Sequence, residues 1–142
     1  MCSSDLEGGA PAGPALDPEL RAEIEQDAYD LTRWRSRNRV RAENDLRQIG
    51  VAALPWLASL ARDPFELTRR AVMRIVRDID SVDGTPILIE GLLDEDRHVR
   101  ETAAEGLRQL TGLDLGYRAD ASVASRLDGY RRWRAWLEER RA

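Results

Sequence analysis

Lysine is absent from this chain of 142 residues, and cysteine and histidine occur once each. The single cysteine, Cys2, excludes an internal disulfide and a cysteine-based zinc site, and the single histidine, His98, excludes a multi-histidine metal site. No apolar run approaches the ~20 residues that a membrane span requires. The sequence therefore offers neither a disulfide framework, nor a metal site built from cysteines or several histidines, nor a transmembrane segment.

All 22 basic residues are consequently arginines, and 26 acidic residues outnumber them, for a formal net charge of −4. A guanidinium fork can hold a carboxylate through two parallel hydrogen bonds, which an ammonium group cannot do. The composition therefore favours arginine–carboxylate pairing. The negative net charge argues against a general nucleic-acid binder.

Residues 1–15 are rich in glycine, proline and alanine and show no hydrophobic periodicity, so we expect them to be disordered. Met1–Leu6 has two interpretations. One is the start of a mature bacterial lipoprotein lipidated at Cys2, although no apolar signal segment precedes that residue here. The other, which we favour, is an artefact, because one frame of a common sequencing adapter encodes Cys-Ser-Ser-Asp-Leu. The compartment, cytoplasmic or envelope-anchored, is left open.

The pattern Ala-x-x-x-(Leu/Ile) recurs along the remaining sequence. It occurs at Ala42/Leu46, at Ala71/Ile75 and at Ala103/Leu107, with steps of 29 and 32 residues between the alanines. Self-similarity at such a period is typical of stacked helical hairpins. We therefore expect residues 16–142 to form one all-α domain.

Apolar spacing and start signals place the individual helices. Asp17 and Pro18 should start the first, Gly50 should close the second in a left-handed conformation, and Asp63 with Pro64 should start the fourth. Val40 and Leu93 are expected to be buried. We expect helices over residues 18–35, from a break at 36–38 to Ile49, and over 52–61, 64–78, a run beginning at Thr85, 96–111 and 122–140.

The last predicted helix has one apolar and one charged face. Stacked repeats need an end element with a polar outer side, so we assign this helix a capping role. Ser122 should start it. Its apolar face is expected to contain Val123, Leu127, Tyr130, Trp133 and Leu137, with Trp136 beside it.

Residues 94–107 read Asp-Glu-Asp-Arg-His-Val-Arg-Glu-Thr-Ala-Ala-Glu-Gly-Leu. This segment resembles the second half of a HEAT repeat, with its acidic turn, Val-Arg, Ala-Ala and Leu. Residues 51–79 match less well, because Leu67-Thr68 stands where Val-Arg is expected. The short spacing resembles that of bacterial HEAT-like repeats, including the phycobilin-lyase-like group. The resemblance covers roughly residues 37–140 and implies an α-α superhelix, a short solenoid ended by a capping helix.

Polar residues on the second helix of each hairpin are candidate partner contacts, because they lie off the buried stripe of a rigid surface. These candidates are Arg70, Arg74, Arg77, Glu101, Glu105 and Arg108. Asp94, Asp96 and Arg100 are assigned instead to bonds between a turn and a neighbouring helix, and His98 is expected to be an ordinary surface residue. The four tryptophans are assigned to packing.

Arginines alternate with other residues through Arg33-Trp-Arg-Ser-Arg-Asn-Arg-Val-Arg41. A break near Ser36 would gather some of them at one end of a hairpin. They are candidates for an anion-binding site for phosphate, nucleic acid or an acidic protein: Arg33, Arg35, Arg37, Arg39 and Arg41. The interpretation that we favour is pairing within the chain, with Asp27, Asp30, Glu43 and Asp45.

No catalytic triad, phosphate-binding loop or metal-ligand pattern is evident, so we expect no enzyme activity and no cofactor. The predicted function is a non-catalytic protein-interaction or scaffold module with a protein partner that the sequence does not identify. Two alternatives stay open. One is a phycobilin-lyase-like enzyme or bilin chaperone, and the other is a nucleic-acid-binding HEAT-like protein that uses residues 33–41.

Overall fold

The computed structural model describes residues 16–141, and every regular element in that range is helical. The predictions made for residues 1–15 lie outside the described range. The all-α prediction is confirmed. The α-helices are α1 (Pro18–Thr32), α2 (Arg39–Ile49), α3 (Leu54–Leu60), α4 (Glu66–Ile79), α5 (Thr85–Gly91), α6 (Arg97–Thr111) and α7 (Val123–Arg141), with short 3-10 turns η2 (Gly50–Ala53) and η3 (Val82–Gly84).

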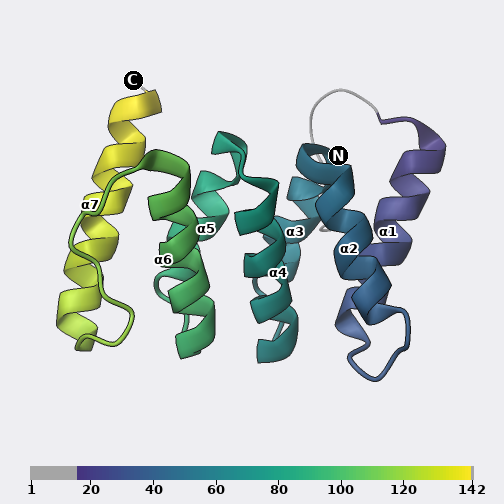
Figure 1. Cartoon of the computed structure of the whole chain (residues 1–142), viewed down its shortest axis with the longest axis horizontal. Coiled ribbons are helices and arrows are strands. Elements are labelled where there is room, and N and C mark those ends of the chain that lie inside the picture. Colours follow the sequence, from purple (N-terminus) through teal and green to yellow (C-terminus); the bar gives the residue numbers. More distant parts are fainter. Residues whose placement is uncertain (1–15, 142) are drawn as a thin grey trace, which may run out of the picture.

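The helices form two layers (Figure 1). Helices α2, α4 and α6 stand side by side in the nearer layer, while α3 and α5 lie behind them. Successive hairpins are α1 with α2, α3 with α4, and α5 with α6. Each hairpin contacts its neighbours along the row, which is the arrangement of a short α-solenoid.

One continuous apolar core runs along the whole stack, from α1 to α7. Helices α4 and α6 each bury a broad stripe of apolar side chains. It includes Val72 and Val76 on α4 and Ala103 and Leu107 on α6. Helix α2 buries only Ala42 and Leu46. Because every layer shares this core, the helices are held at fixed positions relative to one another.

Local sequence explains where α1 begins and ends. The Asp17 carboxylate accepts hydrogen bonds from the backbone N–H groups of Glu19 and Leu20, at 3.1 and 3.2 Å, and Pro18 occupies the first helical position. The helix ends at Thr32, three residues before the predicted end. Thr32 donates its hydroxyl to the carbonyl of Tyr29, and the chain then turns at Arg33.

Two other predicted boundaries differ from the structure. Gly50 has the expected positive φ of 77°, but its ψ of −135° lies outside the left-handed helical region, and the chain continues directly into η2. Helix α4 starts at Glu66 rather than at Pro64. The Asp63 carboxylate accepts the N–H of Phe65, which forms a turn ahead of the helix instead of a cap on it.

Three residues expected on apolar faces are exposed: Val40 by 64%, Leu93 by 45% and Val123 by 71%. Val40 and Val123 lie in the first turns of α2 and α7, and Leu93 lies in the turn that follows α5. Helical spacing alone placed them on an apolar face, but burial also requires a neighbouring helix at that height.

The structural repeat from α4 to α6 is one residue shorter than the step between the alanines of these two helices. Arg69 donates through Nη1 to the carbonyls of Asp63 and Pro64, and Arg100 donates through Nη1 to the carbonyls of Asp94 and Glu95. The step from Arg69 to Arg100 is 31 residues, and so is the step between the first residues of α4 and α6. Thr68-Arg69 is therefore the counterpart of Val99-Arg100, and the predicted alignment on Leu67-Thr68 is wrong.

Helix α7 closes the stack as predicted. It packs beside α5 and buries Trp133 and Leu137, while most of its charged residues remain exposed. Ser122 accepts the N–H of Ser125 at its start. The preceding loop adds Tyr117, whose hydroxyl donates to the carbonyl of Leu92 at 2.7 Å and so ties the loop to the end of α5.

Candidate functional site

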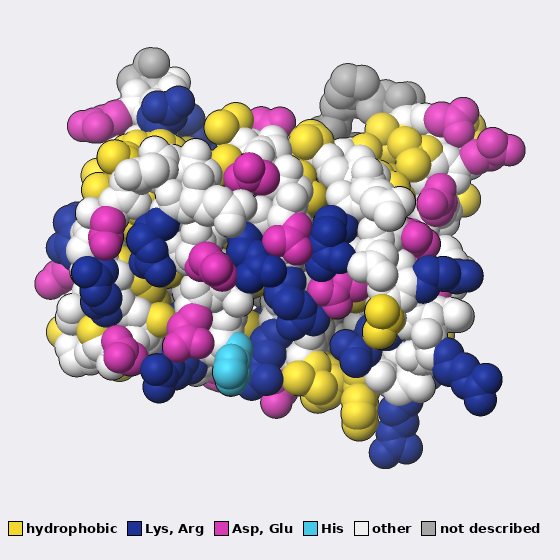
Figure 2. Space-filling view, in the orientation of Figure 1, with side chains coloured by type: hydrophobic (Ala, Val, Ile, Leu, Met, Phe, Trp, Pro, Cys, Tyr) yellow, Lys and Arg dark blue, Asp and Glu magenta, His cyan; other side chains and the backbone are white. Residues whose placement is uncertain are grey.

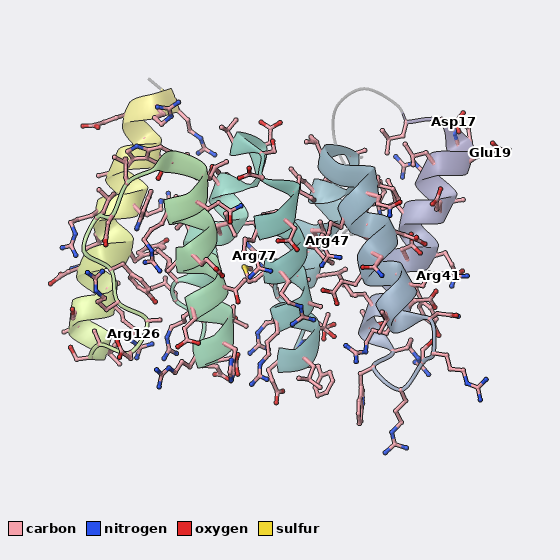
Figure 3. All side chains as sticks on the ribbon, in the orientation of Figure 1. Asp17, Glu19, Arg41, Arg47, Arg77 and Arg126 are labelled. Carbon is pink, nitrogen blue, oxygen red and sulfur yellow. The ribbon has the colours of Figure 1, made fainter. Side chains whose placement is uncertain are left out.

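Arginine–carboxylate pairs connect α2 to α4 and α4 to the segment that ends in α6. Figure 2 shows basic and acidic side chains interspersed over the face formed by α2, α4 and α6, and Figure 3 labels two of these arginines, Arg47 on α2 and Arg77 on α4. We call these contacts the inter-repeat ion pairs. They are Arg74–Glu43 and Arg47–Asp78 between α2 and α4, and Arg69–Asp94, Arg70–Asp96 and Arg77–Glu105 between α4 and the segment that ends in α6, all at 2.8 to 2.9 Å.

The pair formed by Arg69 and Asp94 is the most buried of them. Their side chains are only 11% and 12% exposed, and the guanidinium donates to both carboxylate oxygens, at 2.9 and 3.1 Å. Hydrogen bonding to Asp94 raises the pKa of Arg69. Since Arg69 also holds the carbonyls of Asp63 and Pro64, one side chain joins the turns before α4 and α6.

Asp96 has two structural roles. Its carboxylate accepts both Arg70 donors and also the N–H of Val99, which caps α6. The hydrogen bond from Arg70 lowers the pKa of Asp96 although burial opposes it. The assignment of Asp94 and Asp96 to bonds between a turn and a neighbouring helix is confirmed. Arg100 instead donates to carbonyls of the turn before its own helix and to the carbonyl of Ala119, and His98 is exposed.

The six candidate partner contacts do not form a free surface. Arg70, Arg74 and Arg77 all belong to the inter-repeat ion pairs, as does Glu105. Glu101 accepts a hydrogen bond from Arg97 one turn away at 2.9 Å. Within residues 16–141, Arg108 alone of the six has no side-chain hydrogen bond or ion pair.

The five candidate anion-binding arginines separate into two groups. Arg39 donates to the carbonyl of Trp34 at 3.3 Å, and Arg41 lies 4.0 Å from the Asp45 carboxylate. Arg33, Arg35 and Arg37 are exposed and form no ion pair with any residue between 16 and 141. Of the predicted pairings with Asp27, Asp30, Glu43 and Asp45, only that of Arg41 with Asp45 forms within residues 16–141, and the prediction is wrong for the other four arginines.

The three remaining arginines lie in the same turn as an exposed aromatic side chain, Trp34. Trp34 is 47% exposed, its ring lies 5.8 Å from that of Phe65, and the Arg35 guanidinium lies 5.3 Å from its centroid. Arg33 lies 5.5 Å from the ring of Tyr29, which is also exposed. We call residues 33–37 the Arg–Trp turn. An open pocket of about 490 Å³ is lined by residues 32–36.

The packing role assigned to the tryptophans holds for Trp56 and Trp133, which are buried, and for Trp136, which is half-buried against Trp133. Trp34 differs from them because only part of its ring packs on the domain. The structure therefore presents this side chain to solvent at the α1–α2 end.

An acidic cluster between α1 and α2 was missed by the sequence analysis. Glu23, Asp27 and Asp45 each place a carboxylate oxygen within 4.8 Å of the other two. Asp27 is only 3% exposed. Burial raises its pKa to about 6, Asp45, Glu23 and Asp30 add to the shift, and Arg41 opposes it. The i,i+4 spacing of Glu23 and Asp27 was a visible signal, whereas the approach of Asp45 depends on helix packing.

Comparison with protein families matches the model described as HEAT repeats, over residues 18–108 and again over residues 53–135. Searches of curated proteins and of solved structures gave no match. Among the described residues, no helix combines the length and apolarity that crossing a bilayer would demand. Because the family match spans most of the chain and agrees with the stacked hairpins, this chain belongs to the HEAT-repeat family.

Proposed function

We propose that this chain is a non-catalytic interaction module that binds an acidic polypeptide segment through the Arg–Trp turn. The observation that supports this most directly is the exposed Trp34, which shares a five-residue turn with three exposed arginines that form no ion pair with a described carboxylate. Membership of the HEAT-repeat family supports the general role, since stacked repeats characteristically serve as binding surfaces for other proteins.

The chemistry of the turn suits such a partner. A guanidinium can hold a carboxylate with two hydrogen bonds, and tryptophan and arginine are the residues that most often dominate protein interfaces. Phe65 packs behind Trp34 at 5.8 Å, which limits the side-chain freedom that binding would otherwise remove. Local positive charge on a chain of net charge −4 would also orient an acidic partner toward this end.

The layer formed by α2, α4 and α6 is the weaker candidate surface for a partner. A partner that used Arg70, Arg74 or Arg77 would have to compete with the inter-repeat ion pairs that already hold these side chains. Displacing them would also loosen the stack. We therefore propose that this layer supports the domain and that the Arg–Trp turn makes the principal contact.

Two triple variants with equal loss of charge provide the test. One is R33Q/R35Q/R37Q, and its matched control is R62Q/R140Q/R141Q, which changes exposed arginines that form no ion pair with a described residue. In quantitative pull-downs, acidic proteins held by the wild type and the control should be reduced at least ~10-fold with the turn variant. Equal retention by all three proteins would exclude the turn as the contact surface.

The same variants distinguish binding of nucleic acid from binding of an acidic polypeptide. Binding of a single-stranded oligonucleotide that needs Arg33, Arg35 and Arg37, and whose log affinity falls linearly with log salt concentration, would replace the acidic polypeptide as the ligand class. Loss of binding in both triple variants would indicate a general charge effect rather than a defined site.

A further inference from the structure

Three carboxylates meet where α1 packs against α2. Glu23 and Asp27 lie four residues apart, so both project from the same face of α1. Asp45 reaches them from α2, and one oxygen of each residue lies within 4.8 Å of the other two. We call these three residues the acidic triad.

Asp27 distinguishes the triad from an ordinary acidic surface. It is 97% buried, and its Oδ2 atom has no hydrogen-bond partner among the described residues. A buried polar atom without a partner is costly, so native structures rarely leave one unsatisfied. Arg41 compensates little, because its Nε lies 4.0 Å from Asp45 Oδ2 and its own side chain is largely exposed.

We propose that Glu23, Asp27 and Asp45 bind a hard divalent cation, preferentially Ca²⁺, that joins α1 to α2. A cation held by the Asp27 carboxylate would give this buried group a partner of opposite charge. All three donors are carboxylate oxygens, which suit Ca²⁺, Mg²⁺ or Mn²⁺ and do not favour softer metals. The proposal is independent of the Arg–Trp turn and of any protein partner.

The number of carboxylates favours Ca²⁺. Mg²⁺ demands near-ideal octahedral geometry and is usually held by one or two carboxylates, whereas Ca²⁺ accepts a larger and more flexible set of oxygen ligands. Three carboxylate oxygens that lie within 4.8 Å of one another therefore suit Ca²⁺ better. Glu23 is exposed, which leaves an entry route and room for water to complete the coordination shell.

Thermal unfolding of the full chain tests the site. After EDTA treatment, the chain is titrated with CaCl₂, MgCl₂ or MnCl₂ at constant ionic strength, and the Tm is recorded. A ligand that binds only the folded state raises the Tm with concentration, so Ca²⁺ should raise it most. Isothermal titration of Ca²⁺ should show one site, weakened at least tenfold by Glu23→Gln and tightened by Arg41→Gln, which removes a competing positive charge.

Glu25→Gln is the matched control, because it removes the same charge from the same helix outside the triad. Its Ca²⁺ affinity should stay within twofold of wild type. Glu23 is exposed, so its substitution should leave the fold intact. If Mg²⁺ or Mn²⁺ raised the Tm more than Ca²⁺ did, and Glu23→Gln removed that rise, the site would stand but the preference for Ca²⁺ would be overturned.

Two results would overturn the site itself. One is the absence of any Tm rise at cation concentrations about ten times the ~1 mM dissociation constant of weak protein Ca²⁺ sites. The other is a rise of the same size in wild type, Glu23→Gln and Asp45→Asn, because that would indicate diffuse attraction to an acidic surface.

Discussion

Tyr117 lies directly against Gly129, so closely that a methyl group at Gly129 would stand 2.8 Å from Tyr117 Cδ1 and 3.1 Å from its Cα. Gly129 is in the middle of α7, and Tyr117 belongs to the loop between α6 and α7. The missing side chain leaves room for the ring of Tyr117, whose hydroxyl donates to the carbonyl of Leu92 at the end of α5. This contact attaches the capping helix to the stack.

Gly129→Ala should therefore destabilise the domain. Helix propensity alone would favour alanine by ~1 kcal/mol, but the clash includes backbone of Tyr117 and should produce a net loss of ~1–3 kcal/mol in the free energy of unfolding. Urea denaturation measures the difference. Ala135→Gly on the exposed side of α7 is the control and should lose at most ~1 kcal/mol. A stabilised Gly129→Ala variant would contradict this account of the cap.

Arg69 should not tolerate replacement by lysine. Its guanidinium donates to both Asp94 oxygens and to two carbonyls, a set that one ammonium group cannot reproduce. We expect Arg69→Lys to reduce the free energy of unfolding by ~2 kcal/mol, as measured by urea denaturation. Arg70→Lys, at the more exposed pair with Asp96, should reduce the free energy of unfolding less than Arg69→Lys does. Equal losses of unfolding free energy in the two variants would show that burial does not determine how much each pair contributes to stability.

The inter-repeat ion pair between Arg74 and Glu43 can be tested by exchange of the charges. Arg74→Glu places a second carboxylate next to Glu43 and should destabilise the domain by ~1–2 kcal/mol. The double variant R74E/E43R should recover part of this loss, although Arg47 then faces a positive charge instead of Glu43. Thermal unfolding of the wild type, Arg74→Glu, Glu43→Arg and the double variant gives the coupling energy between the two side chains. No recovery in the double variant would argue against a specific pair.

Asp27 should make stability depend on pH in metal-free buffer. Its pKa is raised from 3.8 to about 6 in the folded state, so the folded chain retains a proton that the unfolded chain has already lost. The free energy of unfolding should therefore fall between pH 4 and 6, and the loss attributable to this group should be ~1–3 kcal/mol. The groups that face Asp27 are Glu23 and Asp30 on α1 and Arg41 and Asp45 on α2.

Asp27→Asn removes this contribution. The variant should gain stability relative to the wild type as the pH rises from 4 to 6.5, and the difference should then stay constant. Unfolding in urea with EDTA present, at a series of pH values, measures it. The carboxylates whose pKa is lowered, including Asp78 and Asp96, titrate in both proteins and cancel in the comparison. A difference that does not change with pH would contradict the raised pKa.

The cap and the Arg–Trp turn show the limit of local sequence patterns. The apolar period and Ser122 were sufficient to place α7, but Gly129 carried no signal of its contact with Tyr117. The alternating arginines were recognised as a candidate site. Arg39 and Arg41 each have a polar partner in the chain, whereas Arg33, Arg35 and Arg37 form no ion pair with a described residue, and this difference depended on where α1 ended.

The sequence by itself determined the helices, the helix starts at Asp17 and Ser122 and the HEAT-type repeat, because these depend on contacts within a few residues and on a period that the chain repeats. The tertiary structure decided which charges meet. Arg69 and Asp94 are 25 residues apart, Arg74 and Glu43 are 31 apart, and Asp27 meets Asp45 across two helices. Such pairs depend on how far one helix is shifted and rotated against the next, and no local spacing specifies that register.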